Sequence, residues 1–119
     1  MLFILENIMR ARNLFDVEFY LNTYTDVAAS GIDPFTHYSL FGWREDRDPS
    51  AFFSTRFYKA INADIKTADI NPLVHYVDFG VQELRDPSPF FDTSIYLSEN
   101  SDVANGATNP LEHFVAFGN

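Results

Sequence analysis

Three histidines are the residues of this chain best suited to chemistry. His37, His75 and His113 recur at an even spacing, and imidazole can bind metals or carry protons near neutral pH. A metal ion needs several ligands that converge on one point. Each histidine lacks a second histidine within helical reach, and the chain has no cysteine. The pattern favours a packing or hydrogen-bonding role, leaves pH sensing as the alternative, and predicts no metal site.

Two acid–arginine pairs are the next candidates for chemistry. Glu45 with Arg47, and Glu83 with Arg85, could supply a catalytic carboxylate and an anion-binding guanidinium. A glycosidase-like carboxylate pair needs one asymmetric cleft, whereas this pair is repeated. We therefore interpret the pairs as structural salt bridges, or as arginines that hold carbonyl groups at helix ends.

Known cofactor motifs do not occur in the sequence. The 17 acidic residues do not form an EF-hand loop. A glycine-rich nonapeptide repeat, a phosphate-binding loop, a dinucleotide fingerprint and a nucleophile elbow are also missing. Most recurring Asp residues are better explained as helix caps. We therefore predict no enzymatic activity and no cofactor, with calcium the one ion that the composition leaves open.

Aromatic side chains give the strongest indication of binding. Trp43 is the only tryptophan and follows Gly42. With Tyr38 and Tyr76 it could stack on the rings of a polysaccharide. The alternative, which we favour, is that Trp43 covers the seam between two repeat units.

The histidines belong to a pattern with a period of about 38 residues, and a period of this size is the mark of a stacked architecture. Prolines, glycines and arginines recur at the same spacing, at positions Pro34, Pro72, Pro110, Gly42, Gly80, Gly118, Arg47 and Arg85. We divide the chain into a cap or partial repeat at 1–14, repeats at 15–52 and 53–90, and a truncated repeat at 91–119. A residue that recurs in every unit is explained first by packing.

Each unit is expected to hold three short helices and an extended connector. The first helix is capped by Asp16, Ser54 or Asp92, and the second begins near Asp26, Asp64 or Asp102. The third follows a capping residue and a proline, as at Asp33-Pro34, and the repeated glycine is expected to end it in a left-handed turn. No stretch alternates like a strand. The sequence predicts an all-α fold, stacked as a short solenoid-like domain because helices this short do not persist alone.

Composition narrows the classes of partner. Hydrophobic residues make up 46% and aromatic residues 17% of the chain, which is enough for a core. The net charge of −9 argues against nucleic acid, which requires clustered Lys and Arg. No apolar stretch approaches the length of a membrane span. Residues 1–5 do not resemble a cleavable signal peptide, so the sequence leaves a cytoplasmic location open.

The combined motif resembles a known bacterial repeat. Phe15-Asp16-x-x-Phe19-Tyr20-Leu21 followed by Asp26-Val27-Ala28-Ala29-x-Gly31 is similar to FDxxYYLxxNPDVAxAG. The segment from Asp33-Pro34 through His37-Tyr38 to Pro49-Ser50 is similar to NPLxHYLxxGWxEGRxPS. The resemblance covers residues 15–119. Asp46 and Leu84 depart from it, because they replace the usual glycine of the E-G-R turn.

The resemblance carries expectations about function. Repeats of this type occur in large secreted or surface proteins of proteobacteria, often beside calcium-repeat regions, and as accessory segments of some glycosyltransferases. It implies an extracellular or cell-surface location and no catalytic residues. We expect a non-enzymatic scaffold, self-assembly or adhesion module that forms homo-oligomers by head-to-tail stacking. A carbohydrate-binding accessory domain is the alternative.

Overall fold

The computed structural model describes residues 9–106 and 108–118. Within these ranges the chain is helical and has no β-strand, and its only strand-like pairings are isolated bridges between Ser50 and Phe53 and between Ser88 and Phe91. The predicted all-α class is therefore confirmed for the described part. The first eight residues of the predicted cap, and Asn119 at the end of the third repeat, lie outside it.

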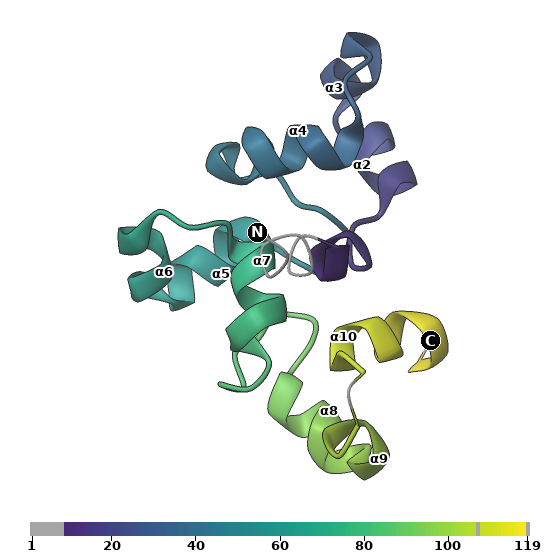
Figure 1. Ribbon diagram of the computed structural model, residues 1–119, viewed down its shortest axis with the longest axis vertical. Coiled ribbons are helices and arrows are strands. Elements are labelled where there is room, and N and C mark those ends of the chain that lie inside the picture. The colour runs from purple at the N-terminus through teal and green to yellow at the C-terminus, as the bar shows by residue number, and fades with distance from the viewer. Residues whose placement is uncertain (1–8, 107, 119) are drawn as a thin grey trace.

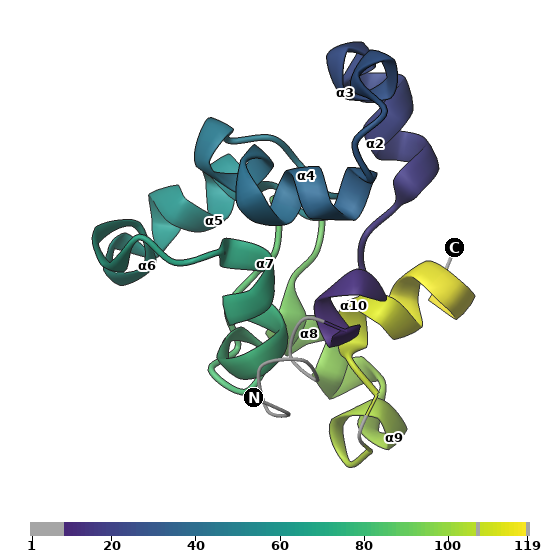
Figure 2. The same cartoon turned by 45° about the horizontal axis from the view of Figure 1, so that its top comes forward.

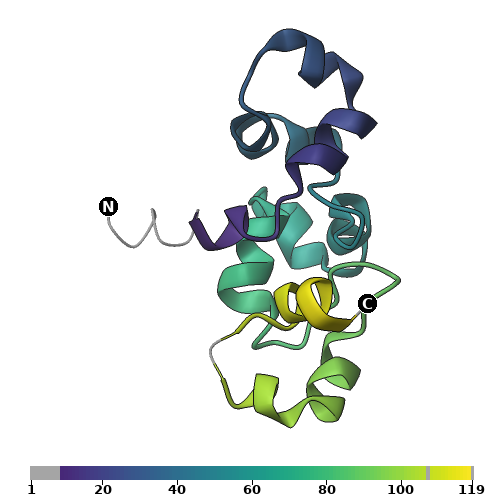
Figure 3. The same cartoon turned by 90° about the vertical axis from the view of Figure 1, so that its right-hand side faces the viewer.

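Three groups of short helices follow one another along the chain (Figure 1). The first contains α2 (Val17–Thr23), α3 (Thr25–Ser30), α4 (Pro34–Leu40) and the 3-10 turn η1 (Gly42–Glu45). The second contains α5 (Thr55–Ile61), α6 (Ala63–Ala68), α7 (Pro72–His75) and the π turn η2 (Tyr76–Gly80). The third contains α8 (Thr93–Glu99), α9 (Ser101–Ala104), α10 (Pro110–His113) and the π turn η3 (Phe114–Gly118). Figure 3 shows the groups in this order along the long axis.

Side-chain caps fix where the helices begin. Asp16, Ser54 and Asp92 each accept a hydrogen bond from the backbone N–H three residues ahead. Asp33 and Asn71 cap α4 and α7 in front of a proline, whose missing N–H has no helical partner to lose at that position. The predicted caps are therefore confirmed, and local sequence sets the helix starts.

A continuous aromatic core runs through the groups. Tyr20 and Tyr38 are fully buried and meet edge to face, with ring centroids 6.0 Å apart. Tyr58 and Tyr76 repeat this contact at the same distance in the second group. Such pairs contribute about 0.5–1.5 kcal/mol beyond the area that they bury. In these two groups the first helix is thus held against the third helical segment by a pair of tyrosine rings.

The third group also contacts the connector that follows the first group. The rings of Phe52 and Phe114 lie 5.4 Å apart in a T-shaped arrangement, and Figure 2 shows α10 beside the short helical segment that precedes α2. In a strict solenoid each unit touches only its neighbours in sequence. This contact instead brings the third group back against an earlier part of the chain. The molecule measures 43 × 32 × 31 Å.

Candidate functional site

Each of the three histidines hydrogen-bonds a tyrosine in the first helix of its own group. The Nδ1 atoms of His37 and His75 lie 2.8 Å from the hydroxyls of Tyr20 and Tyr58. His113 makes the same bond to Tyr96 at 2.5 Å. Burial is the largest of the effects that lower the pKa of His75. The histidine therefore joins the third helix of its group to the first, and His37 and His75 do so within the buried core.

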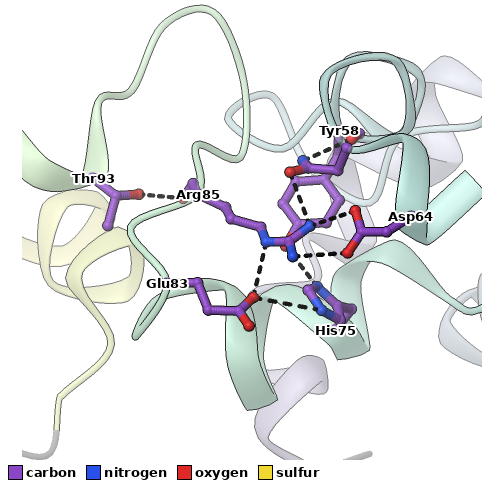
Figure 4. A network of polar contacts seen from close by, with 7 residues as sticks. Tyr58, Asp64, His75, Glu83, Arg85 and Thr93 are labelled. Carbon is purple, nitrogen blue, oxygen red and sulfur yellow. Dashed lines mark hydrogen bonds and ion pairs between the residues drawn. The ribbon is translucent and has the colours of Figure 1, made fainter.

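The repeated arginines clamp the second helix of a group to the connector (Figure 4). Arg85 binds both oxygens of Asp64, at 2.9 and 2.8 Å, and its Nε lies 2.8 Å from Glu83. Hydrogen bonding to Arg85 lowers the pKa of Asp64 to about 2. A third donation, to the side chain of Asn62 at 2.9 Å, leaves few guanidinium donors for a ligand.

The first group contains the equivalent clamp. Arg47 binds both oxygens of Asp26, at 2.8 and 2.7 Å, and its Nε lies 2.9 Å from Glu45. The side-chain hydrogen bond to Arg47 lowers the pKa of Asp26 to about 2. The acid–arginine pairs noted in the sequence are thus parts of larger ion-pair networks that bind within the chain.

The repeated glycines make room for tyrosine rather than turning the chain. A Cβ on Gly42 would stand 2.2 Å from the hydroxyl of Tyr20, and one on Gly80 would stand 2.3 Å from that of Tyr58. A Cβ on Gly118 would stand 2.6 Å from a ring carbon of Phe114. None of these glycines has a positive φ. The prediction that they end helices in a left-handed turn is therefore wrong, because close packing accounts for them.

Left-handed backbone occurs at other positions. Gly31 has φ 77°, and Asp69, which holds the equivalent position in the second repeat, has φ 56°. Asp46 and Leu84 have φ 60° and 59°, and these are the two positions at which the sequence departs from the E-G-R turn of the repeat that it resembles. Asp tolerates this conformation better than Leu does. The sequence therefore departs from the repeat at the two positions where glycine would relieve strain.

Buried hydroxyl pairs join one group to the next. Tyr38 and Thr55 are hydrogen-bonded at 2.9 Å, and Tyr76 and Thr93 at 3.2 Å. The Thr55 hydroxyl also donates to the carbonyl oxygen of Arg47 at 2.7 Å, so it accepts from Tyr38. All four hydroxyl side chains are buried. We call the contacts around these two pairs the first junction and the second junction.

The aromatic residues singled out for ligand stacking are buried. Trp43 is 5% exposed, Tyr38 and Tyr76 are 0% exposed, and Arg44 covers the Trp43 ring at 4.3 Å. The expectation that these rings stack on a polysaccharide is corrected, because they offer no open face. The Trp43 indole donates to the carbonyl of Ser39 at 3.0 Å, and its own carbonyl lies 3.5 Å from the Lys59 ammonium. Trp43 therefore belongs to the first junction.

A cleft of about 730 Å³ opens beside the second junction. Its walls include apolar side chains from η2, the connector, α8 and α9, namely Val77, Val81, Leu84, Leu97 and Val103. Asp78 also lines it, and one oxygen of this carboxylate is buried without a hydrogen-bond partner. Burial raises the pKa of Asp78, and the charge of Arg10 opposes that effect.

Asp78 was not singled out from the sequence, although the sequence does mark this residue as unusual. The residues at the equivalent positions are Leu40 and Ala116, so Asp78 interrupts the repeat with a charge. The period draws attention to residues that recur, whereas an asymmetric site is marked by a residue that does not recur. A repeated sequence can therefore indicate an asymmetric site at a position where one copy carries a different type of residue.

Two features of the described part bear on ligands and membranes. Within residues 9–106 and 108–118, no three His, Asp or Glu side chains are grouped as a metal ion would require. Over the same residues, no helix combines the length and apolar character that crossing a bilayer demands. The histidines, placed in three separate groups of helices, are not brought together.

Comparison with known proteins gives no further assignment. No family model, no curated protein and no solved structure matches the chain.

Proposed function

We propose that this chain is a non-enzymatic structural module, a scaffold element at a bacterial surface in which the helical repeat units stack as a short solenoid-like domain. One observation carries the proposal: the repeated polar residues bind one another. The histidines bind tyrosines, the arginines bind Asp and Glu, and the threonines bind tyrosines across the junctions. Contacts of this kind stabilise the fold of the chain itself. The surface location rests on the resemblance of the motif alone.

Mutual support between the groups is the testable core of this proposal. Thr93→Val removes one buried hydroxyl at the second junction, far along the chain from α2. If the groups depend on one another, amide protons of α2 and α4 lose hydrogen-exchange protection together with those of α8. Unchanged protection of α2 and α4, with loss confined to the third group, would overturn the scaffold proposal.

Self-assembly or adhesion is a second role, favoured by exposed aromatic rings. Phe90 and Phe117 are each 77% exposed, and exposed apolar surface often marks contact with another protein. Light scattering over a hundredfold dilution series should give masses above 13.6 kDa at high concentration, and Phe90→Ser with Phe117→Ser should abolish the increase. A mass that stays at the monomer value at all concentrations removes this role and leaves the scaffold role in place.

A further inference from the structure

The cleft at the second junction is asymmetric, because several residues that line it differ from those at the equivalent positions of the first junction. Leu84 and Leu97 line it, and they stand where the first junction has Asp46 and Lys59, which form an ion pair. An apolar pair has therefore replaced a salt bridge, and a carboxylate, Asp78, has entered at a position that is apolar in the other two copies. These changes give the second junction an open cleft in which apolar side chains lie beside the carboxylates of Asp78 and Glu112 and the guanidinium of Arg10.

The Asp78 carboxylate defines the chemistry of a ligand. Its buried oxygen accepts no hydrogen bond, and leaving such an atom without a donor is unfavourable. The side-chain torsion of Asp next to the carboxylate is broad and nearly two-fold, so rotation about it exchanges the two oxygens and either one can face the cleft. A cationic donor that reaches it would gain a charge-assisted hydrogen bond.

The walls define the rest of the ligand. Val77, Val81 and Leu97 offer an apolar surface beside the acid, which suits a chain of methylene groups ending in a positive charge. A lysine side chain has this form, and its ammonium is a compact charge suited to one acceptor oxygen, whereas an arginine is suited to bidentate partners. The net charge of −9 favours the approach of a basic partner.

We propose that this cleft binds a lysine side chain of a partner protein, with the ammonium at Asp78 and the methylene groups between the apolar walls. The proposal goes beyond the scaffold role and does not depend on it. It assigns a partner-binding site to the second junction, and it assigns none to the first, where Leu40 replaces the acid and the ion pair of Asp46 with Lys59 occupies the corresponding wall.

Nuclear magnetic resonance with two matched peptides tests the proposal on the intact chain. The first probe is acetyl-Gly-Lys-Gly-amide, and the second replaces Lys with norleucine, which keeps the methylene groups and lacks the amine. We expect saturable shifts of the amides of Gln82, Leu84 and Asn109 with the lysine peptide, and at least about tenfold weaker binding of the norleucine peptide. Equal binding of the two peptides, or shifts spread over the whole acidic surface, would overturn the proposal.

Three variants locate the binding. Asp78→Asn keeps the shape of the side chain and should weaken binding of the lysine peptide at least about tenfold. Glu99→Gln removes an equal charge outside the cleft and should leave the affinity unchanged. Leu84→Asp with Leu97→Lys copies the first junction into the second, retains Asp78, and should also abolish binding. If Asp78→Asn and the double variant bind as well as the original chain, the cleft is not the site.

Discussion

The two junctions have the same buried contact and opposite surroundings. In both, a tyrosine hydroxyl binds a threonine that also donates to a backbone carbonyl. Around the first junction lie ion pairs, between Lys59 and Asp46 and between Arg44 and Asp69. The second junction has Leu97 and Leu84 at the positions of Lys59 and Asp46. The buried hydroxyl pair is thus the constant part of the junction, and its surroundings vary.

The difference follows from the energetics of the two kinds of contact. An ion pair near the surface contributes about 0–1 kcal/mol, and Lys59 and Asp46, the pair that leucines replace, have side chains that are 19% and 44% exposed. Such a pair can be exchanged for apolar residues at little cost. A buried hydroxyl that loses its partner costs about 1–3 kcal/mol. We infer that the surroundings can change to create a site while the hydroxyl pair keeps adjacent groups in register.

Substitution of the glycines should lower the free energy of unfolding more than the other substitutions do, and by a similar amount in the first and second groups. Gly42→Ala and Gly80→Ala each force a methyl group into a tyrosine hydroxyl, so we expect each to lower the free energy of unfolding by about 1–3 kcal/mol. Urea denaturation measures both. The combination of Gly80→Ala with Tyr58→Phe should recover part of the loss, because it removes the obstructing oxygen. If the alanine variants are as stable as the original chain, the close packing described here is incorrect.

The threonines test whether the two junctions share one buried contact. Thr55→Val and Thr93→Val each leave a tyrosine hydroxyl without an acceptor, and should each lower the free energy of unfolding by about 1–2 kcal/mol. Adding Tyr38→Phe to the first variant, or Tyr76→Phe to the second, should restore much of the loss because no polar group then remains unpaired. A large difference between the two threonine variants would contradict the shared contact.

Substitution of Leu84 by glycine should have a smaller effect on the free energy of unfolding, and it should raise stability rather than lower it. It holds φ 59° and is 52% exposed, so Leu84→Gly relieves a left-handed conformation at little loss of packing. We expect the free energy of unfolding to rise by about 1 kcal/mol, measured by thermal and urea denaturation. Gln82→Gly, in the same connector, is the control and should lower stability. If both glycine variants lose stability, the backbone at Leu84 is not strained.

The arginine clamps should have the smallest effect on the free energy of unfolding, and their signature is the slope of stability against pH in acid. The pKa of Asp64 is about 2 in the folded chain, below its ordinary value of 3.8, so its ionised form favours folding. This contribution is fully present above about pH 4 and is lost as the pH falls towards 2. Arg85→Gln should therefore flatten the stability profile in this window, and Arg47→Gln should do the same through Asp26.

The matched control for the acid experiment is Arg56→Gln, which removes the same charge from an exposed position on α5. It should leave the slope of stability between pH 4 and 2 close to that of the original chain. An Arg85 variant whose slope equals that of the Arg56 variant would show that the clamp does not couple folding to protonation.

Local structure could be predicted from residue types at fixed spacing. The caps at Asp16, Ser54 and Asp92 and the proline starts of the third helices depend on side chains close in sequence to the backbone that they bind. The all-α class followed from the same signals. The repeated glycines were noticed but misinterpreted, because a local rule for helix ends was applied where the cause is Tyr20 or Tyr58, in the first helix of the same group.

The sequence by itself determined where the helices begin, which residues recur, and that the recurring residues serve packing. Only the tertiary structure decided which residues meet: histidine with tyrosine, arginine with the second helix, and Phe52, in the connector after the first group, with Phe114 in the third. Helix starts depend on short-range hydrogen bonds along the chain, whereas clefts and clamps depend on how distant segments pack. The carboxylate of Asp78 became a candidate site only when that packing buried one oxygen without a partner.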